Sequence, residues 1–270
     1  MNDSSRRCCL LLAVAVLASP LLTGCETTVP RVMKAGSFST VVVDAGHGGK
    51  DPGERPRGRQ AEKDLALDTA LRLASLLRES GLKTVLTRSD DTFVELDDRV
   101  AIADRYGPDA ILVSIHYNAS GSSASRGVET YFWRPDSQGL ATRVQRNLLS
   151  ETGQSNHGVI RRVLRLTHNP REPAILVEAG YLTNGSDYAL ATSADYRQKV
   201  AEGIADGIVE QHENGDAGIQ RLPPVVSYHP ARHTYRRHHV SARHHGKASS
   251  KSSKAKAKAK VRAKKKKKGR

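Results

Sequence analysis

Three short runs of apolar, mostly β-branched residues in this chain lead into a histidine or a carboxylate. The run 40–43 is followed within four residues by His47, and the other two runs lead directly into His116 and Glu178. Continuous apolar runs of this length are typical of strands buried in a parallel sheet. In open α/β sheets the functional crevice lies outside the carboxyl ends of the strands. We therefore expect these three side chains to converge, although they lie far apart in the sequence.

Between residues 39 and 212 the short apolar runs alternate with segments of helical periodicity, which predicts one α/β domain with a largely parallel sheet. About 175 residues are enough for one sizeable core, since domains usually hold roughly 100 to 200 residues. The clearest helix is leucine-rich and begins at Glu62, and Gly81 ends it. Other helices are expected over 96–105, 138–151 and 196–211, and strands over 83–87 and 128–133.

The first 24 residues have the pattern of an export signal, with Arg6 and Arg7 before an apolar stretch over 10–22. The tetrapeptide that ends at Cys25 resembles the lipobox of bacterial lipoproteins, in which cleavage before the cysteine makes it the lipid-bearing first residue. An ordinary secretory signal and an uncleaved anchor are the alternatives. Residues 25–38 are expected to form a short tether. Since the chain has no cysteine beyond Cys25, any metal must be held by histidine and carboxylate.

The net charge of +15 is concentrated in the tail, residues 214–270. This tail holds 18 of the 43 Lys and Arg residues and only one of the 28 acidic residues, so its net charge is +17 and that of the rest is −2. It is rich in His, Arg, Lys and Pro and includes five consecutive lysines at 264–268. Such a composition buries too little apolar surface to offset the entropy of ordering, so we expect a disordered tail beyond a catalytic domain at 39–213.

His47 and His116 are candidate metal ligands, because catalytic zinc sites combine imidazole and carboxylate ligands and leave one position open. Glu62 is the best-placed third ligand, since it stands at the start of the leucine-rich helix. Each residue also has a simpler explanation. His47 alone suits a solvated loop, and Glu62 alone suits a first-turn acid that complements the helix dipole. Asp44 is expected either to fix the tautomer of a ligating imidazole or to serve as a turn residue.

Glu178 is a candidate proton-transfer group, because a carboxylate that directly follows an apolar run needs a metal, a hydrogen bond or a chemical role to offset its burial. Asn118 is a candidate substrate contact, with a simple turn residue as the alternative. His157 and His168 are expected in loops at the surface or at the substrate rim, outside the metal site.

Six ordered segments carry a resemblance to a known family. They are residues 43–49 with 51–53, 62–64, 86–88 with 91–94 and 99–101, 113–119, 126–131 and 173–184. Over roughly residues 39–212 the chain resembles the zinc-dependent N-acetylmuramoyl-L-alanine amidases, which hydrolyse bacterial cell walls. So many matches in one order are specific, whereas a lone His-Gly-Gly is not.

The resemblance implies that His47, Glu62 and His116 bind Zn²⁺ and that Glu178 is the catalytic acid/base. It implies a twisted, mostly parallel sheet flanked by helices, in agreement with the alternation of elements. The implied reaction is hydrolysis of the amide between the lactyl group of N-acetylmuramic acid and the L-alanine of the peptidoglycan stem peptide. Zinc would polarise the carbonyl and acidify water.

Two departures from the family pattern are visible. Tyr117 stands where relatives commonly have a small residue, and we expect it to reshape the cleft beside His116. The span 133–159 is too short for the inhibitory insert of division-associated relatives, so we expect activity without an activator.

The expected partners are peptidoglycan as substrate, a membrane through the lipid at Cys25, and anionic envelope polymers through the tail. A lysine run also suits nucleic acid, but export excludes it as a physiological partner. We expect a monomeric lipoprotein of the bacterial cell envelope that faces the periplasm. Glu26 after Cys25 favours the outer membrane, because it is not the aspartate linked to inner-membrane retention in enteric bacteria.

Two other functions remain open from the sequence. A zinc peptidase or deacetylase acting on peptidoglycan would use the same metal chemistry on a different bond. A wall-binding lipoprotein without hydrolytic activity would not need Glu178, and its binding would survive a chelator.

Overall fold

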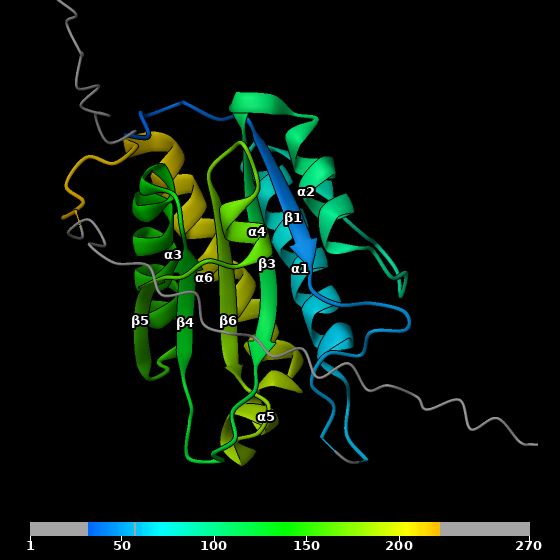
Figure 1. Ribbon diagram of the computed structural model, residues 1–270. Coiled ribbons are helices and arrows are strands. Elements are labelled where there is room, and N and C mark those ends of the chain that lie inside the picture. The colour runs from blue at the N-terminus through cyan, green and yellow to red at the C-terminus, as the bar shows by residue number, and fades with distance from the viewer. Residues whose placement is uncertain (1–31, 57, 222–270) are drawn as a thin grey trace, which may run out of the picture. The chain divides into compact units, whose positions relative to one another are not determined.

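The computed structural model describes residues 32–56 and 58–221, and their centre is a six-stranded sheet (Figure 1). The strand order is β2 (Lys83–Leu86), β1 (Thr40–Ala45), β3 (Ala110–Asn118), β6 (Ala174–Tyr181), β4 (Val128–Phe132) and β5 (Asn156–Arg161). Every neighbouring pair is parallel except β4 with β6. The expected mostly parallel α/β sheet is thus confirmed. The signal peptide 1–24, Cys25 and the tail beyond residue 221 lie outside the described residues.

Helices cover both faces of the sheet and make three layers (Figure 1). One face packs against α1 (Glu62–Glu79), α3 (Gln138–Thr152) and α6 (Ala194–Asn214), which share the larger apolar core with β1, β3 and β6. The other face packs against α2 (Leu96–Asp104) and α4 (Arg165–His168) in a smaller core around Val42 and Leu112. The short α5 (Gly185–Ala191) follows β6. None of the described helices is long and apolar enough to cross a membrane.

The expected helices 96–105, 138–151 and 196–211 and strands 83–87 and 128–133 correspond closely to α2, α3, α6, β2 and β4. The leucine-rich helix begins at Glu62 as predicted. His157 lies in β5 and His168 ends α4, so the expectation that they lie in loops is wrong, but both are exposed at the surface and outside the candidate metal site as expected. β5 was missed because it lies at the edge of the sheet and its first two residues are exposed, so it lacks the continuous apolar run of a buried strand.

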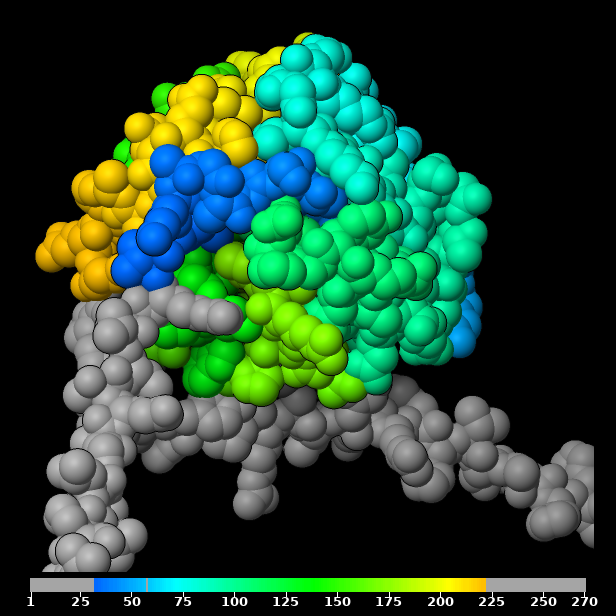
Figure 2. Space-filling view, turned by 90° about the horizontal axis from the view of Figure 1, so that it is seen from above, coloured from blue at the N-terminus to red at the C-terminus, as the bar shows by residue number. Residues whose placement is uncertain are grey.

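The two ends of the described chain meet at one pole of the molecule, which Figure 2 views from above. The Met33 amide donates to the Asp216 carboxylate over 2.9 Å, and the Asp216 amide donates to the Met33 carbonyl over 2.8 Å. Arg221 binds the same carboxylate over 2.6 Å. Met33 and Phe38 are buried. Parts of the segments expected to be tether and tail are therefore packed onto the catalytic domain.

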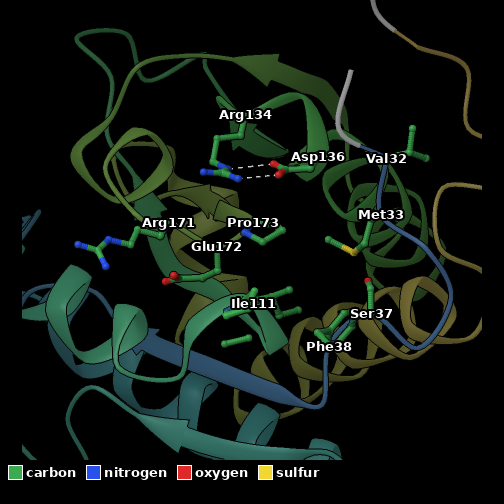
Figure 3. A pocket seen from close by; sticks show the side chains of 12 residues that line it. Val32, Met33, Ser37, Phe38, Ile111, Arg134, Asp136, Arg171, Glu172 and Pro173 are labelled. Carbon is green, nitrogen blue, oxygen red and sulfur yellow. Dashed lines mark hydrogen bonds and ion pairs between the residues drawn. The ribbon is translucent and has the colours of Figure 1, made fainter. Parts of the chain in front are cut away.

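A cavity of about 160 Å³ lies at this pole (Figure 3). Its apolar wall includes Met33, Phe38 and Ile111, and Arg134 and Asp136 form an ion pair across its upper side (Figure 3). Glu172 also lines the cavity. It is only 1% exposed, and neither of its carboxylate oxygens accepts a hydrogen bond. Burial, with the nearby Asp104 carboxylate, raises the pKa of Glu172 to about 7, although the charge of Arg134 opposes this.

Glu172→Gln is expected to stabilise the protein more at high pH than at low pH. Because the pKa of Glu172 is about 7 in the folded chain against the ordinary value of 4.5, the folded state holds the proton more tightly than the unfolded state. Ionisation therefore destabilises the wild type as the pH rises from about 4.5 to about 7. Urea unfolding of both proteins at pH 4.5 and pH 8 measures this. A difference in unfolding free energy that does not grow with pH would contradict the prediction.

Candidate metal and catalytic site

His47 lies in a tight loop just beyond β1 and adopts a left-handed backbone conformation, with φ of 59°. This conformation is unfavourable for a residue with a side chain, and two buried arginines hold it in place. Arg99 donates to the His47 carbonyl over 2.6 Å, and Arg88 donates to the Gly46 carbonyl over 2.7 Å. The loop therefore presents the imidazole from a braced backbone.

Glu62 is the first residue of α1 and is 4% exposed. Its Oε1 atom lies 3.0 Å from His47 Nε2 and 2.9 Å from His116 Nδ1, and it accepts the Tyr117 amide over 3.1 Å. Its Oε2 atom accepts the Glu54 amide over 2.9 Å. Burial raises the pKa of Glu62, but the two imidazoles outweigh burial and hold that pKa far below its usual range.

His116 projects from β3, and its ring meets that of His47 edge-on with the centroids 4.8 Å apart. One ligand atom from each of His47, Glu62 and His116 lies within 4.8 Å of the others. The space around them is small, because a Cβ atom on Gly53 would lie 2.5 Å from Glu62 Oε2 and 2.6 Å from the His47 ring. The structure thus brings together the three predicted ligands, whose two nitrogens and one oxygen fit a metal ion such as zinc.

Asp51 orients the His47 ring by a 2.8 Å hydrogen bond to Nδ1, which leaves Nε2 facing Glu62. Such a carboxylate behind a ligating histidine fixes its tautomer. Burial lowers the pKa of His47, but the hydrogen bonds and charges of Glu62 and Asp51 outweigh burial and raise it. Binding a metal ion at Nε2 would therefore displace a proton that these carboxylates favour.

Asp44 does not contact His47, and the expectation that it fixes the tautomer is wrong. Its carboxylate is fully buried and accepts hydrogen bonds, each 2.6 Å long, from Arg99, Thr87 and Ser114. Burial raises the pKa of Asp44, but Arg99 and the two hydroxyls outweigh it and hold the pKa low. Because Arg99 also donates to the His47 carbonyl, Asp44 supports the backbone of the site through Arg99 and does not orient the imidazole.

Glu178 lies on β6 directly opposite His116 on β3. Its Oε2 atom is buried and accepts no hydrogen bond. Burial and the nearby charges of Glu62 and Glu129 raise the pKa of Glu178 well above its usual range, against the effect of Arg162. A carboxylate with raised proton affinity beside a metal site is suited to take up and return a proton.

His47, Glu62, His116 and Glu178 line one cleft of about 380 Å³. The side walls include Leu96 from α2 and Leu164 and Arg165 from the α4 region. Asn118 lines the cleft, but its amide nitrogen donates to Glu129 and its oxygen accepts the Ala119 amide over 2.7 Å.

Tyr117 is among the residues that line the cleft, but its side chain packs away from the cleft instead of reshaping it as expected. It is buried in the main core, and its hydroxyl lies 2.8 Å from that of Thr69 on α1. The reason is the alternation of β3, which directs Tyr117 to the face opposite that of His116.

Sequence reasoning gave no role to three further residues of the site, Asp51, Arg88 and Glu129, although all three lie in the segments that carry the family resemblance. Asp51 follows the glycine-rich loop closely in sequence, so its proximity to His47 was a usable signal. Arg88 and Glu129 gave only a weak signal. Arg88 reaches the loop from beyond β2, and Glu129 is a buried acid at an alternate position of β4.

The chain was compared with known proteins. Residues 41–210 match the family described as N-acetylmuramoyl-L-alanine amidase. Protein YqiI of Bacillus subtilis is 39% identical over 173 residues, which cover 63% of this chain and 82% of YqiI. N-acetylmuramoyl-L-alanine amidase LytC of the same organism is 37% identical over 177 residues, which cover 64% of this chain but only 35% of LytC.

The fold is similar to that of the catalytic domain of CwlV, an N-acetylmuramoyl-L-alanine amidase from Bacillus (Paenibacillus) polymyxa var. colistinus. The TM-score is 0.62 with 41% sequence identity, over 64% of this chain and 97% of the CwlV domain. The matched family segment includes His47, Glu62, His116 and Glu178. The chain therefore belongs to the N-acetylmuramoyl-L-alanine amidase family.

Proposed function

We propose that the folded domain is a zinc-dependent amidase that cuts peptidoglycan between the lactyl group of N-acetylmuramic acid and the L-alanine of the stem peptide. One observation carries the proposal: two imidazoles and a carboxylate converge beside Glu178 in a single cleft. Membership of the amidase family supports the choice of bond.

His47, Glu62 and His116 would hold the zinc ion, with Asp51 fixing the His47 ring from behind. When bound, zinc supplies Lewis-acid chemistry, polarising the lactyl carbonyl and lowering the pKa of water toward ~7. The glycines beside His47 serve the packing of the loop, because a Cβ atom on Gly46 would clash with the His116 ring and one on Gly48 with the Thr92 carbonyl.

Glu178 performs the proton transfers. Its carboxylate takes a proton from the attacking water as the water oxygen bonds to the lactyl carbonyl carbon. It then gives that proton to the alanine nitrogen as the carbon–nitrogen bond breaks, so the products are a lactyl carboxylic acid and a free amine. The amine takes up the remaining proton of the acid at neutral pH, which leaves a carboxylate and an ammonium group. The raised pKa of Glu178 suits both steps, because the group must accept and release a proton near neutral pH. Asn118 is proposed to contact substrate from the same cleft wall.

Export and anchoring are proposed from the sequence, with Cys25 as the lipidated residue in a cell-envelope protein that acts as a monomer and faces the periplasm, with the outer membrane favoured. The basic tail is proposed to bind anionic polymers of the envelope. Residues 222–270 carry 17 of the 43 Lys and Arg residues and no acidic residue. Binding through such exposed charges is screened by salt beyond roughly 8 Å at physiological ionic strength.

Glu178→Gln is expected to keep its zinc and lose turnover, with kcat lowered by roughly 10²- to 10⁴-fold, the usual contribution of a general acid/base. His47→Ala and His116→Ala should lose zinc as well as activity, because each removes a ligand. Metal analysis of the purified variants, together with rates on purified peptidoglycan, checks both statements. Full zinc occupancy in either histidine variant would remove that residue from the ligand set, and wild-type rates for Glu178→Gln would refute its role.

Mass spectrometry of the soluble products identifies the bond. The protein starting at Glu26 is expected to release intact stem peptides with a free L-alanine amino terminus, and a chelator should abolish the release until zinc is restored. Peptides cut within the stem would indicate a peptidase, and loss of acetyl groups alone would indicate a deacetylase. Wall binding without any product, unchanged by the chelator, would indicate a non-hydrolytic lipoprotein.

Truncation after Arg221 is expected to weaken binding to purified cell walls at low salt but not at high salt. We place the truncation after Arg221 because Arg221 binds Asp216 and the Pro135 carbonyl within the folded domain. Co-sedimentation with walls at two salt concentrations measures the effect, and zinc content and thermal midpoint serve as controls for folding. Equal binding by both proteins at low salt would refute the role of the tail.

A further inference from the structure

Three polar residues occupy matching positions on three neighbouring strands beside the cleft. The strands β3, β6 and β4 lie side by side (Figure 1). His116 on β3 lies opposite Glu178 on β6, and Glu178 lies opposite Glu129 on β4. The first is a metal ligand and the second the proposed proton-transfer group. Glu129 has neither role, yet it is only 3% exposed, and a buried carboxylate needs compensation.

Glu129 collects the hydrogen-bond donors of this part of the site. Its Oε1 atom accepts the Tyr131 hydroxyl over 2.8 Å, the Tyr181 hydroxyl over 3.0 Å and the Asn118 amide. Glu178 is the neighbouring carboxylate, and its charge acts on both tyrosines, since it contributes to their raised pKa values. Nevertheless its Oε2 atom accepts no hydrogen bond.

This contrast is unusual, because buried carboxylate oxygens almost always find donors when donors are nearby. Both hydroxyls rotate freely about their C–O bonds and can choose between acceptors. Here the three donors converge on a single oxygen of Glu129. A donor that turned to Glu178 would occupy the carboxylate that has to bind the attacking water.

We propose that Glu129 is a positioning residue for the hydrolysis: by engaging Asn118, Tyr131 and Tyr181, it keeps the carboxylate of Glu178 free to receive the proton of the attacking water. The inference rests on the proposed function of Glu178. It does not make Glu129 catalytic, because Glu129 reaches the reaction only through its neighbours.

Glu129→Gln tests this with little change of shape. The amide keeps one acceptor oxygen but adds two donors next to Glu178. We expect kcat to fall at least about tenfold while KM stays within about threefold, since the substrate-binding groups remain in place. Zinc content should equal that of the wild type. Glu172→Gln is the matched control, because it makes the same replacement at another buried glutamate, at the opposite pole, and should leave kcat unchanged.

The decisive measurement is rescue. Tyr131→Phe and Tyr181→Phe, added to Glu129→Gln, remove the hydroxyls that would otherwise turn to Glu178, so kcat should rise at least about threefold above that of Glu129→Gln alone. A purely structural role for Glu129 predicts a further loss instead. Wild-type kcat in Glu129→Gln, or no recovery in the triple variant, would overturn the proposal. If Glu129→Gln shows no thermal unfolding transition, Glu129→Asp replaces it, with a smaller loss and the same rescue expected.

The bond that the wild-type protein cuts in the same assay distinguishes a failure of this proposal from a failure of the proposed function. If it cuts a different bond of peptidoglycan, the amidase assignment fails, while the comparison of variants still tests Glu129 on the bond that is cut. If it cuts none, both proposals fail.

Discussion

The buried ion pair between Asp44 and Arg99 holds the candidate metal site to the sheet. Asp44 stands at the end of β1 and binds Ser114 of β3 and Thr87 beyond β2, so one carboxylate joins three strands. Arg99 enters from α2 and continues to the carbonyls of Ala45 and His47. Removing one partner of such a pair leaves an uncompensated buried charge, at a cost of about 3–5 kcal/mol. The left-handed backbone of His47 depends on this support.

The same arrangement explains why the ligands can come from distant parts of the sequence. His47 follows β1, His116 lies near the carboxyl end of β3, and Glu62 begins the helix that packs behind them. The sheet and the helix fix the backbone of His116 and Glu62, and Arg88 and Arg99 fix the loop of His47. A metal ion would therefore bind to groups that are already in place, and little ordering would oppose binding.

Much of this was predictable from the sequence, and the reason is physical. Strands buried on both faces must be apolar throughout, so β1, β3 and β6 and the polar residues at their ends are visible in the sequence. The amphipathic helices α1, α3 and α6 show their periodicity for the same reason. A strand at the edge of the sheet need not be apolar throughout, so β5 was not predicted. The short helix α4 was not predicted either. The hydrogen-bond partners of Asp44 were also not predicted, because the fold brings the residues of a buried polar network together and the sequence shows no periodic pattern for them. The donors of Glu129 come from three strands, and only the strand order brings them together.

The described chain enters and leaves the domain at one pole (Figure 1), where Met33 and Asp216 hydrogen-bond to each other. The cleft lies at the carboxyl ends of β1 and β3, because His47, His116 and Asn118 line it. Segments joined to either end therefore start from the side of the domain that is remote from the reacting bond. A cross-linked polymer network, far larger than the enzyme, can approach the cleft without first displacing the attachment points of these segments. The domain thus presents its cleft to such a surface, while Met33 and Asp216 lie on its other side.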